Sequence, residues 1–308
     1  MKVAIFGMGS IGQRQARILS QDLGHELLAY RSGRNPAGNG LGIGEVIDFE
    51  EVLRFKPQAA FITNPTNLHL ETALRCAAGG MHLFIEKPLS HSLEQIDELE
   101  AVCRRKGLTA YVAYGLRFHP VIKKLKELAA GKKVTHARVV CSSYLPEWRR
   151  QGGNYSSYAD QGGGVLLDLS HEFDYIHYIL GPIRKISGKV GRVGGVTVDA
   201  EDFADLCLLA GDSVPVNLYL NIASHRPERY LQIDLEGGYL YGDLLDNRVD
   251  LVFDGKKDTY RYQAERDDYL REQARYFFAN LGNPSIMNDL TESRKVLEKI
   301  LEFKNGKR

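Results

Sequence analysis

Three glycines near the start of the chain have the spacing of a phosphate-binding turn. Gly7, Gly9 and Gly12, with Ser10 and Ile11 between them, directly follow the apolar run at residues 3–6. Glycines at this spacing permit a tight turn, a close approach of the backbone to a pyrophosphate, and close packing of the next helix on the strand. The pattern predicts a strand, a turn and a helix that bind a dinucleotide.

The identity of that dinucleotide depends on the end of the second predicted strand, at residues 25–30. An acid at this point typically binds the ribose of NAD, whereas an arginine accommodates the phosphate of NADP. Here the strand is followed by Arg31 and Ser32, which offer a guanidinium and a hydroxyl to a phosphate. We therefore predict that NADP(H) is preferred, with NAD(H) as the second possibility.

A second candidate follows the predicted strand at residues 82–85, which ends in Glu86-Lys87-Pro88. Ligands of open α/β sheets bind outside the carboxyl ends of the strands, so Lys87 stands where a reactive group is useful. An ordinary surface lysine is the alternative. A family resemblance set out below, together with the need to aim Lys87 back across the end of the strand, leads us to expect a cis Lys87–Pro88 peptide bond.

A third candidate is a histidine beside an acid, after the glycines at residues 162–164. If a helix begins near Val165, Asp168 and His171 are three residues apart and share a face. A histidine takes up a proton near neutral pH, and a carboxylate beside it orients the ring. A structural pairing at a helix surface is the alternative. No second histidine has the spacing of a zinc site, so no metal is predicted.

Composition limits the classes of protein to which the chain can belong. The chain has 308 residues, 44% of them hydrophobic and 26% charged, and a net charge of +1, which predicts an ordinary soluble protein with two domains. No basic block indicates nucleic acid, and no apolar run is long enough to cross a membrane. The four cysteines have no paired spacing, which predicts buried thiols in a reducing cytoplasm.

The predicted elements divide into two patterns. As far as about residue 117, short apolar strands alternate with helices, which favours a dinucleotide-binding domain built on a doubly wound parallel sheet. From residue 118 to 308, a long strand at 134–144 and several β segments between 204 and 253 predict an α+β domain with an open, mostly antiparallel sheet. One face of that sheet has no predicted cover, which favours a homo-oligomer assembled through it.

The order of these motifs resembles one family. The glycine turn, Asn64-Pro65 with His69, Glu86-Lys87-Pro88, and the triple glycine with Asp168 and His171 are similar to the glucose–fructose oxidoreductase / inositol dehydrogenase / MocA (Gfo/Idh/MocA) family over essentially the whole chain. The resemblance implies a Rossmann domain followed by a domain on an open antiparallel sheet. It also implies hydride transfer between a nicotinamide and a secondary alcohol or ketone of a sugar, a cyclitol or a related compound.

The resemblance also implies roles for individual residues. Lys87 would hydrogen-bond the reacting hydroxyl, His171 would take its proton, and Asp168 would hold the site in place. Asn64, Pro65, His69 and Glu86 would line the nicotinamide and its ribose, while Lys87, Arg117, Trp148, Tyr155 and His171 would contact the substrate. The stretches around Arg117, Trp148 and Tyr155 resemble a subgroup associated with surface-polysaccharide sugars.

One departure from the family pattern leaves alternatives open. Many relatives have four residues from the acid to the histidine, whereas Asp168 and His171 are three apart, which turns one side chain relative to the other by about 100° on a helix. Tyr155 or Tyr158 is therefore an alternative acid/base. A dinucleotide-binding sensor and a nicotinamide-assisted hydrolase are the alternative functions.

Overall fold

The computed structural model describes residues 1–33, 39–148, 158–196 and 198–306. They form two compact units: unit 1 comprises Met1–Tyr114 and Arg266–Arg294, and unit 2 comprises Gly115–Glu265 and Lys295–Arg308. Unit 1 thus includes a late segment that the predicted contiguous division at residue 117 assigns to the second domain.

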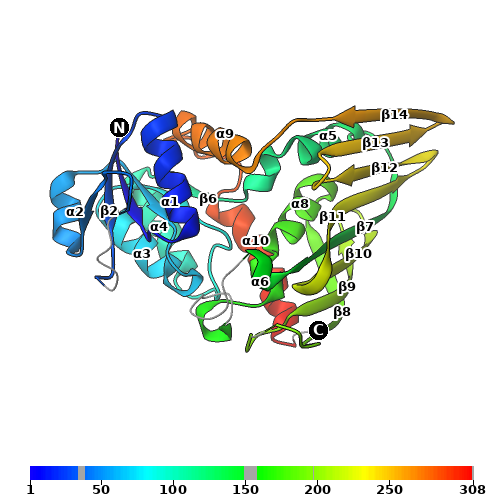
Figure 1. Cartoon of the computed structure of the whole chain (residues 1–308), viewed down its shortest axis with the longest axis horizontal. Coiled ribbons are helices and arrows are strands. Elements are labelled where there is room, and N and C mark those ends of the chain that lie inside the picture. Colours follow the sequence, from blue (N-terminus) through cyan, green and yellow to red (C-terminus); the bar gives the residue numbers. More distant parts are fainter. Residues whose placement is uncertain (34–38, 149–157, 197, 307–308) are drawn as a thin grey trace. The chain divides into compact units, whose positions relative to one another are not determined.

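In its described residues, unit 1 contains a six-stranded parallel sheet, whose strands are among the blue and cyan elements of Figure 1. The strand order is β3-β2-β1-β4-β5-β6. Its strands are β1 (Lys2–Phe6), β2 (Glu26–Tyr30), β3 (Gly44–Val46), β4 (Ala59–Ile62), β5 (His82–Ile85) and β6 (Ala110–Val112). The order reverses direction between β1 and β4, and such switch points are where doubly wound sheets bind ligands. The predicted parallel sheet is confirmed.

The helical elements of unit 1 are α1 (Ser10–Arg17), η1 (Ile18–Asp22), α2 (Phe49–Phe55), η2 (Thr66–Leu68), α3 (His69–Ala78), α4 (Ile96–Lys106) and α9 (Arg266–Ala279). The helix predicted after the glycine turn is α1, which begins at Ser10 and continues into the π-helical turn η1. Helix α10 (Leu290–Lys304) begins in unit 1.

Aromatic packing explains why α9 returns to unit 1. The ring of Phe277 is fully buried and lies edge-on to Phe61 of β4 and Phe84 of β5, at centroid distances of 5.7 and 5.5 Å. Gln273 Nε2 donates a hydrogen bond to the Tyr111 hydroxyl at 3.0 Å. Apolar side chains of β4 and β5 thus need α9 to remove them from water.

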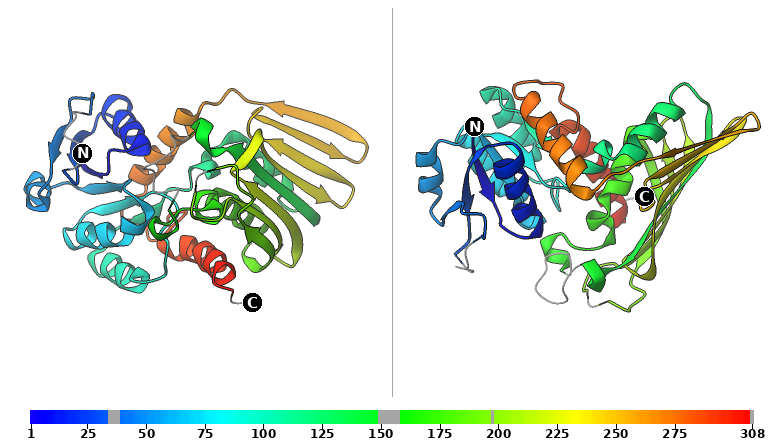
Figure 2. Two further views of the ribbon diagram at one scale, coloured as in Figure 1. Left: turned by 60° about the horizontal axis from the view of Figure 1, so that its bottom comes forward. Right: turned by 45° about the horizontal axis from the view of Figure 1, so that its top comes forward.

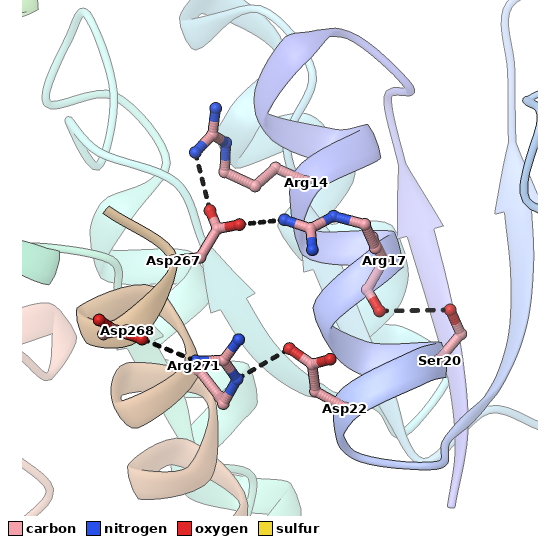
Figure 3. A network of polar contacts seen from close by, with 7 residues as sticks. All are labelled: Arg14, Arg17, Ser20, Asp22, Asp267, Asp268 and Arg271. Atoms are coloured by element: carbon pink, nitrogen blue, oxygen red, sulfur yellow. Dashed lines mark hydrogen bonds and ion pairs between the residues drawn. The ribbon is translucent and has the colours of Figure 1, made fainter. Parts of the chain in front are cut away.

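Ion pairs tie α9 to the first helix (Figure 3). Asp267 accepts hydrogen bonds from Arg14, at 2.7 Å, and from Arg17. Arg271 Nε donates to Asp22 Oδ2 at 2.8 Å, at the end of η1. These partly exposed pairs add specificity rather than much stability, and they fix α9 against the helix whose N-terminus carries the glycine turn.

Unit 2 contains, in its described residues, an eight-stranded sheet with the order β14-β13-β12-β11-β7-β10-β9-β8. Its strands are β7 (Val134–Tyr144), β8 (Ile183–Gly191), β9 (Phe203–Ala210), β10 (Val214–Asn221), β11 (Ala223–Leu235), β12 (Gly238–Asp243), β13 (Arg248–Phe253) and β14 (Lys256–Arg261). Neighbouring strands are antiparallel except β7 and β10, which are parallel. The predicted open, mostly antiparallel sheet is confirmed.

One face of this sheet carries the helices of unit 2 (Figures 1 and 2). These elements are η3 (Gly115–Phe118), α5 (Pro120–Ala129), α6 (Leu145–Trp148), η5 (Ala159–Gln161), α7 (Val165–Asp168) and α8 (Ser170–Leu180). Alternation in β9 buries Leu206 and Leu208 on the helical side and exposes Cys207 and Leu209 on the other. Within the described residues, no helix covers that second face (Figure 2).

Two ion pairs, each to a buried acid of α8, fix this helix within unit 2. Arg117 donates from Nε and Nη2 to Asp174, with distances of 2.7–3.2 Å, and both side chains are 1% exposed. Arg229 of β11 donates to Glu172, which is fully buried, at 2.7 and 2.8 Å. Buried charges of this kind require their partners, since removing one leaves the other uncompensated.

The four cysteines are free, and three of them are buried as predicted, but Cys207 is exposed because it lies on the uncovered face of the sheet. Along the described ranges, no helix combines the length and the apolar character that a bilayer crossing requires.

The Arg117–Asp174 pair gives a stability prediction. Asp174→Asn should lower the free energy of unfolding by about 3–5 kcal/mol, because it leaves the Arg117 guanidinium buried without a counter-charge. Glu236→Gln, which removes a carboxylate from an exposed pair with Lys133, should cost less than about 1 kcal/mol. Urea unfolding of both variants measures the difference, and equal losses would show that the Arg117–Asp174 pair is not a structural requirement.

Candidate functional site

The turn between β1 and α1 is built by glycines that have no room for a side chain. Gly7 has φ +98°, and a Cβ there would lie 2.6 Å from the Asn64 nitrogen. A Cβ on Gly12 would lie 2.0 Å from the Gly7 carbonyl oxygen, which also accepts a hydrogen bond from Thr63 Oγ1 at 2.6 Å. The helix therefore packs directly on the end of the strand, as the sequence pattern requires.

The middle glycine faces open space. A Cβ on Gly9 would meet no atom within 4 Å, although Gly9 has an ordinary φ of −72°. Its role is therefore access rather than backbone conformation, as a pyrophosphate that approaches the backbone requires. Ser10 and Ile11 open α1 behind it, with their N–H groups at the positive end of the helix dipole.

Buried polar atoms without partners lie at the carboxyl end of β4. They are Asn64 Oδ1, Thr66 Oγ1 and Asn67 Oδ1, which lack hydrogen-bond partners among the described residues. Buried polar groups are normally satisfied, so unpaired ones in a cluster point to a ligand with polar atoms. Together with the glycine turn, these residues fit a bound dinucleotide.

The carboxyl end of β2 carries both a cation and an acid. Arg31 Nη1 lies 3.0 Å from both carboxylate oxygens of Glu45, which belongs to β3. Ser32, the other residue predicted to bind a phosphate, is exposed. Glu45 was not predicted from the sequence, because a single acid after a glycine-rich stretch gives no signal until β3 is known to pair with β2.

His69 connects two of the predicted cofactor segments. It is 1% exposed; its Nδ1 lies 2.9 Å from the Pro88 carbonyl oxygen, and its Nε2 lies 3.0 Å from that of Asn64. Burial lowers the pKa of His69 to about 4, so the ring is neutral at pH 7 and donates only one of these two hydrogen bonds. The buried His69 ring thus connects the backbone of the Asn64-Pro65 segment to that of the Glu86-Lys87-Pro88 segment.

The Glu86-Lys87-Pro88 segment follows β5 at the same edge of the sheet. The Lys87–Pro88 bond is cis, as predicted. Glu86 Oε1 accepts a hydrogen bond from Gln15 of α1 at 3.4 Å. Burial raises the pKa of Glu86, against the opposing effect of Lys87. Lys87 itself is partly buried.

Unit 2 holds the other predicted catalytic residues, and here one structural expectation is wrong. Asp168 is the last residue of α7, and His171 is the second residue of α8. Between them Leu169 has φ −98° and ψ 30°, which ends the first helix. The two residues therefore do not share one continuous helix, and their spacing of three does not fix their relative direction.

The glycines before α7 make room for an acid. A Cβ on Gly164, which has φ +106°, would lie 2.7 Å from the carboxylate of Glu201. That carboxylate pairs with Lys304 of α10 at 3.1 Å. The third glycine of the run thus serves packing inside unit 2.

The residues predicted to contact the substrate differ in their exposure to solvent. Arg117 is 2% exposed and pairs with Asp174, so its guanidinium lies in the interior of unit 2. Tyr158 is 39% exposed. Tyr155 and the side chain of Trp148 lie outside the described residues. The roles of Glu172, Asp174 and Arg229 were not predicted either, although two acids in a largely apolar helix indicate cationic partners.

Comparison with family models accounts for both units. A model described as "Oxidoreductase family, NAD-binding Rossmann fold" matches residues 1–114, and the "GFO/IDH/MocA C-terminal domain" matches residues 122–241. The chain belongs to the Gfo/Idh/MocA family of oxidoreductases. The resemblance stated from the motifs is confirmed, and the dinucleotide that fits the turn is NAD(P).

Relatives of the chain are named for different reactions. The chain is 25% identical to a 2,7-anhydro-N-acetylneuraminate hydratase of Mediterraneibacter gnavus, over 87% of this chain and 75% of that protein. It is 26% identical to a myo-inositol 2-dehydrogenase of Thermotoga maritima, over 65% of this chain and 60% of that protein.

Solved structures share the fold at lower identity. A levoglucosan dehydrogenase in complex with NADH and levoglucosan superposes with a TM-score of 0.85 at 15% identity, covering 100% of this chain and 98% of that one. The UDP-N-acetylglucosamine 3-dehydrogenase of Acidithiobacillus ferrooxidans gives a TM-score of 0.81 at 19% identity, with 98% and 96% covered.

The second and third glycines of the turn, Gly9 and Gly12, should respond differently to substitution. Gly9→Ala should change stability by less than about 0.5 kcal/mol and weaken NAD(P) binding about tenfold, because its Cβ enters the space needed by the pyrophosphate. Gly12→Ala should cost about 2 kcal/mol or more of stability, because its Cβ meets the Gly7 carbonyl. Thermal unfolding and calorimetric titration measure the two effects, and a stability loss in Gly9→Ala would contradict the assignment.

The buried His69 should make stability fall in acid. Because its pKa is depressed in the folded state, the unfolded chain binds more protons between pH 6.5 and 4, and stability decreases over that window by up to about 3 kcal/mol. His69→Gln should flatten this part of the profile. His136→Gln, which changes a partly exposed histidine of the unit 2 sheet, is the control, and urea unfolding from pH 7 to pH 4 is the measurement. An unchanged slope in His69→Gln would refute the interpretation.

Proposed function

We propose that this protein is an NAD(P)-dependent oxidoreductase that interconverts a secondary alcohol and a ketone on a sugar, a cyclitol or a sugar derivative. The observation that carries the proposal is the carboxyl edge of unit 1, where the glycine turn, the unpaired polar atoms of residues 64–67 and Lys87 lie on the ends of β1, β4 and β5. The relatives support the substrate class, since their names include an inositol dehydrogenase and sugar dehydrogenases.

The chemistry needs a hydride carrier and two protein groups. When bound, the dinucleotide supplies or accepts the hydride at its nicotinamide. Lys87 hydrogen-bonds the reacting oxygen, because a positive charge stabilises the alkoxide character that develops there. His171 takes the hydroxyl proton in the oxidative direction and returns it in reduction. Asp168 holds this part of the site in place, and Tyr155 or Tyr158 is the alternative acid/base.

The remaining cofactor contacts are proposed at the same edge. Asn64, Pro65, His69 and Glu86 line the nicotinamide and its ribose, with His69 acting through the backbone segments that it joins. Arg31 and Ser32 receive the 2′-phosphate, so that NADP(H) binds more tightly than NAD(H).

Three residues of unit 2 are proposed to contact the substrate, in addition to Lys87 of unit 1. They are His171, Trp148 and Tyr155. Arg117 contributes indirectly, since its pair with Asp174 fixes the helix that carries His171. The uncovered face of the unit 2 sheet, where Leu209 and Tyr219 are exposed, supports a homo-oligomer in which that face is buried. We place the protein in the cytoplasm, and polysaccharide sugar metabolism is its proposed context.

A second candidate function comes from the hydratase relative, which is matched over 87% of this chain. In this alternative the bound dinucleotide would serve as a hydride carrier with no net change, and the net reaction would add or remove water. The two candidates differ in a simple observable. A dehydrogenase changes NAD(P)H absorbance in proportion to substrate, whereas net hydration proceeds with no accumulation of NAD(P)H.

Substitution of Lys87 tests the primary proposal. Lys87→Met should lower turnover at least about 100-fold, while the affinity for dinucleotide, measured by titration, changes little. His171→Asn should likewise reduce kcat far more than it raises KM. The assay uses myo-inositol, levoglucosan and UDP-N-acetylglucosamine as test compounds, each with NADP⁺ and with NAD⁺.

Lys106→Met is the matched control, because Lys106 lies at the C-terminal end of α4 and donates to the Ala78 carbonyl. It should retain full turnover. Wild-type rates in Lys87→Met would remove Lys87 from the mechanism, and wild-type rates in His171→Asn would transfer the acid/base role to a tyrosine.

A further inference from the structure

The ion pair at the end of β2 is a fixed structure rather than a chance surface contact. Strands β2 and β3 pair in parallel with Ala29 opposite Glu45, and the Arg31 N–H donates to the Val46 carbonyl at 2.9 Å. The side chains of Arg31 and Glu45 are only 16% and 23% exposed. The backbone hydrogen bonds between β2 and β3 therefore hold the two residues next to each other independently of their charges.

Asn39 holds the acid from the other side. Its Nδ2 donates to Glu45 Oε1 at 2.7 Å and to the Ile43 carbonyl at 2.8 Å. Its Oδ1 accepts from the N–H groups of Leu41 and Ile43. The Glu45 carboxylate is thus held by the turn at residues 39–43 on one side and directed at Arg31 on the other.

This arrangement changes what Arg31 offers to a nucleotide. A phosphate monoester that approaches the guanidinium must compete with the carboxylate that already accepts its hydrogen bonds and balances its charge. A ribose hydroxyl meets no such conflict, because a carboxylate accepts its hydrogen bond as readily as the acid that commonly ends β2.

We propose that Glu45 is a specificity-determining residue, which limits the preference of this protein for NADP(H) over NAD(H) by holding the guanidinium of Arg31. The inference rests on the dinucleotide site of the proposed function. It adds that discrimination is set by a pair from two strands, and that the wild-type protein binds both dinucleotides with affinities within about tenfold of each other.

Removal of the acid tests the proposal by binding alone. Glu45→Gln keeps the shape of the side chain and its contact with Asn39 but frees Arg31 from its counter-charge. The affinity for NADP⁺, measured by isothermal titration calorimetry at fixed ionic strength, should rise about tenfold, with that for NAD⁺ unchanged or lower. Glu26→Gln is the matched control: it removes an exposed carboxylate at the other end of β2 and should leave the ratio of affinities as it is.

A double-mutant cycle shows whether Glu45 acts through Arg31. In an Arg31→Gln background, Glu45→Gln should no longer change the ratio of NADP⁺ to NAD⁺ affinity. If it still raises that ratio, Glu45 acts by direct repulsion and the proposal is overturned. A ratio unchanged by Glu45→Gln in the wild-type background also overturns it.

The test separates this inference from the function on which it rests. If the wild-type protein binds neither dinucleotide, the proposed function and the inference fail together. If both dinucleotides bind and turnover occurs, but Glu45→Gln leaves their affinities as they were, the inference alone fails. Thermal unfolding of each variant verifies that the fold is retained.

Discussion

The close contact between α1 and the end of β1 is the constraint on which unit 1 depends. Gly12 lies so near the Gly7 carbonyl that no side chain fits between them, and Thr63 at the end of β4 donates to the same carbonyl oxygen. The Gly7 carbonyl oxygen, at the end of β1, therefore packs against α1 and accepts a hydrogen bond from the end of β4. The open space before Gly9 and the unpaired atoms of the Asn64 segment exist because these three elements meet there.

In unit 2, the comparable constraint is electrostatic. Helix α8 carries two acids among apolar residues, and each is held by an arginine from another element: Arg117 from η3 and Arg229 from β11. Burial of charge favours a single arrangement of partners, since any rotation of the helix separates them at high cost. The position of His171 at the start of α8 is supported by the pairs that its neighbours Glu172 and Asp174 form.

Sequence patterns predicted much of this architecture because they record local requirements. Apolar runs predicted the parallel strands, alternation predicted the antiparallel sheet, and the strand at 134–144 was placed within its observed limits. The features that the sequence did not reveal depend on partners distant in the chain or on single dihedral angles. The break at Leu169, the burial of Arg117 and the placement of Glu45 beside Arg31 each require knowledge of which elements pack together. The glycine spacing correctly predicted the turn between β1 and α1. It did not indicate that Gly164 is needed because the Glu201 carboxylate occupies the space of a side chain.

The return of α9 to unit 1 has a consequence for synthesis of the chain. Residues 115–265 are made between the two parts of unit 1, so β4 and β5 emerge from the ribosome long before Phe277 is available to cover Phe61 and Phe84. During that interval the nascent Rossmann sheet exposes aromatic surface, and contacts so distant in sequence form slowly. Unit 2, whose strands and helices are nearly contiguous, can fold while unit 1 waits for its final helix. The same topology makes the N-terminal dinucleotide-binding region, expressed without residues 266–294, a poor candidate for an independent domain.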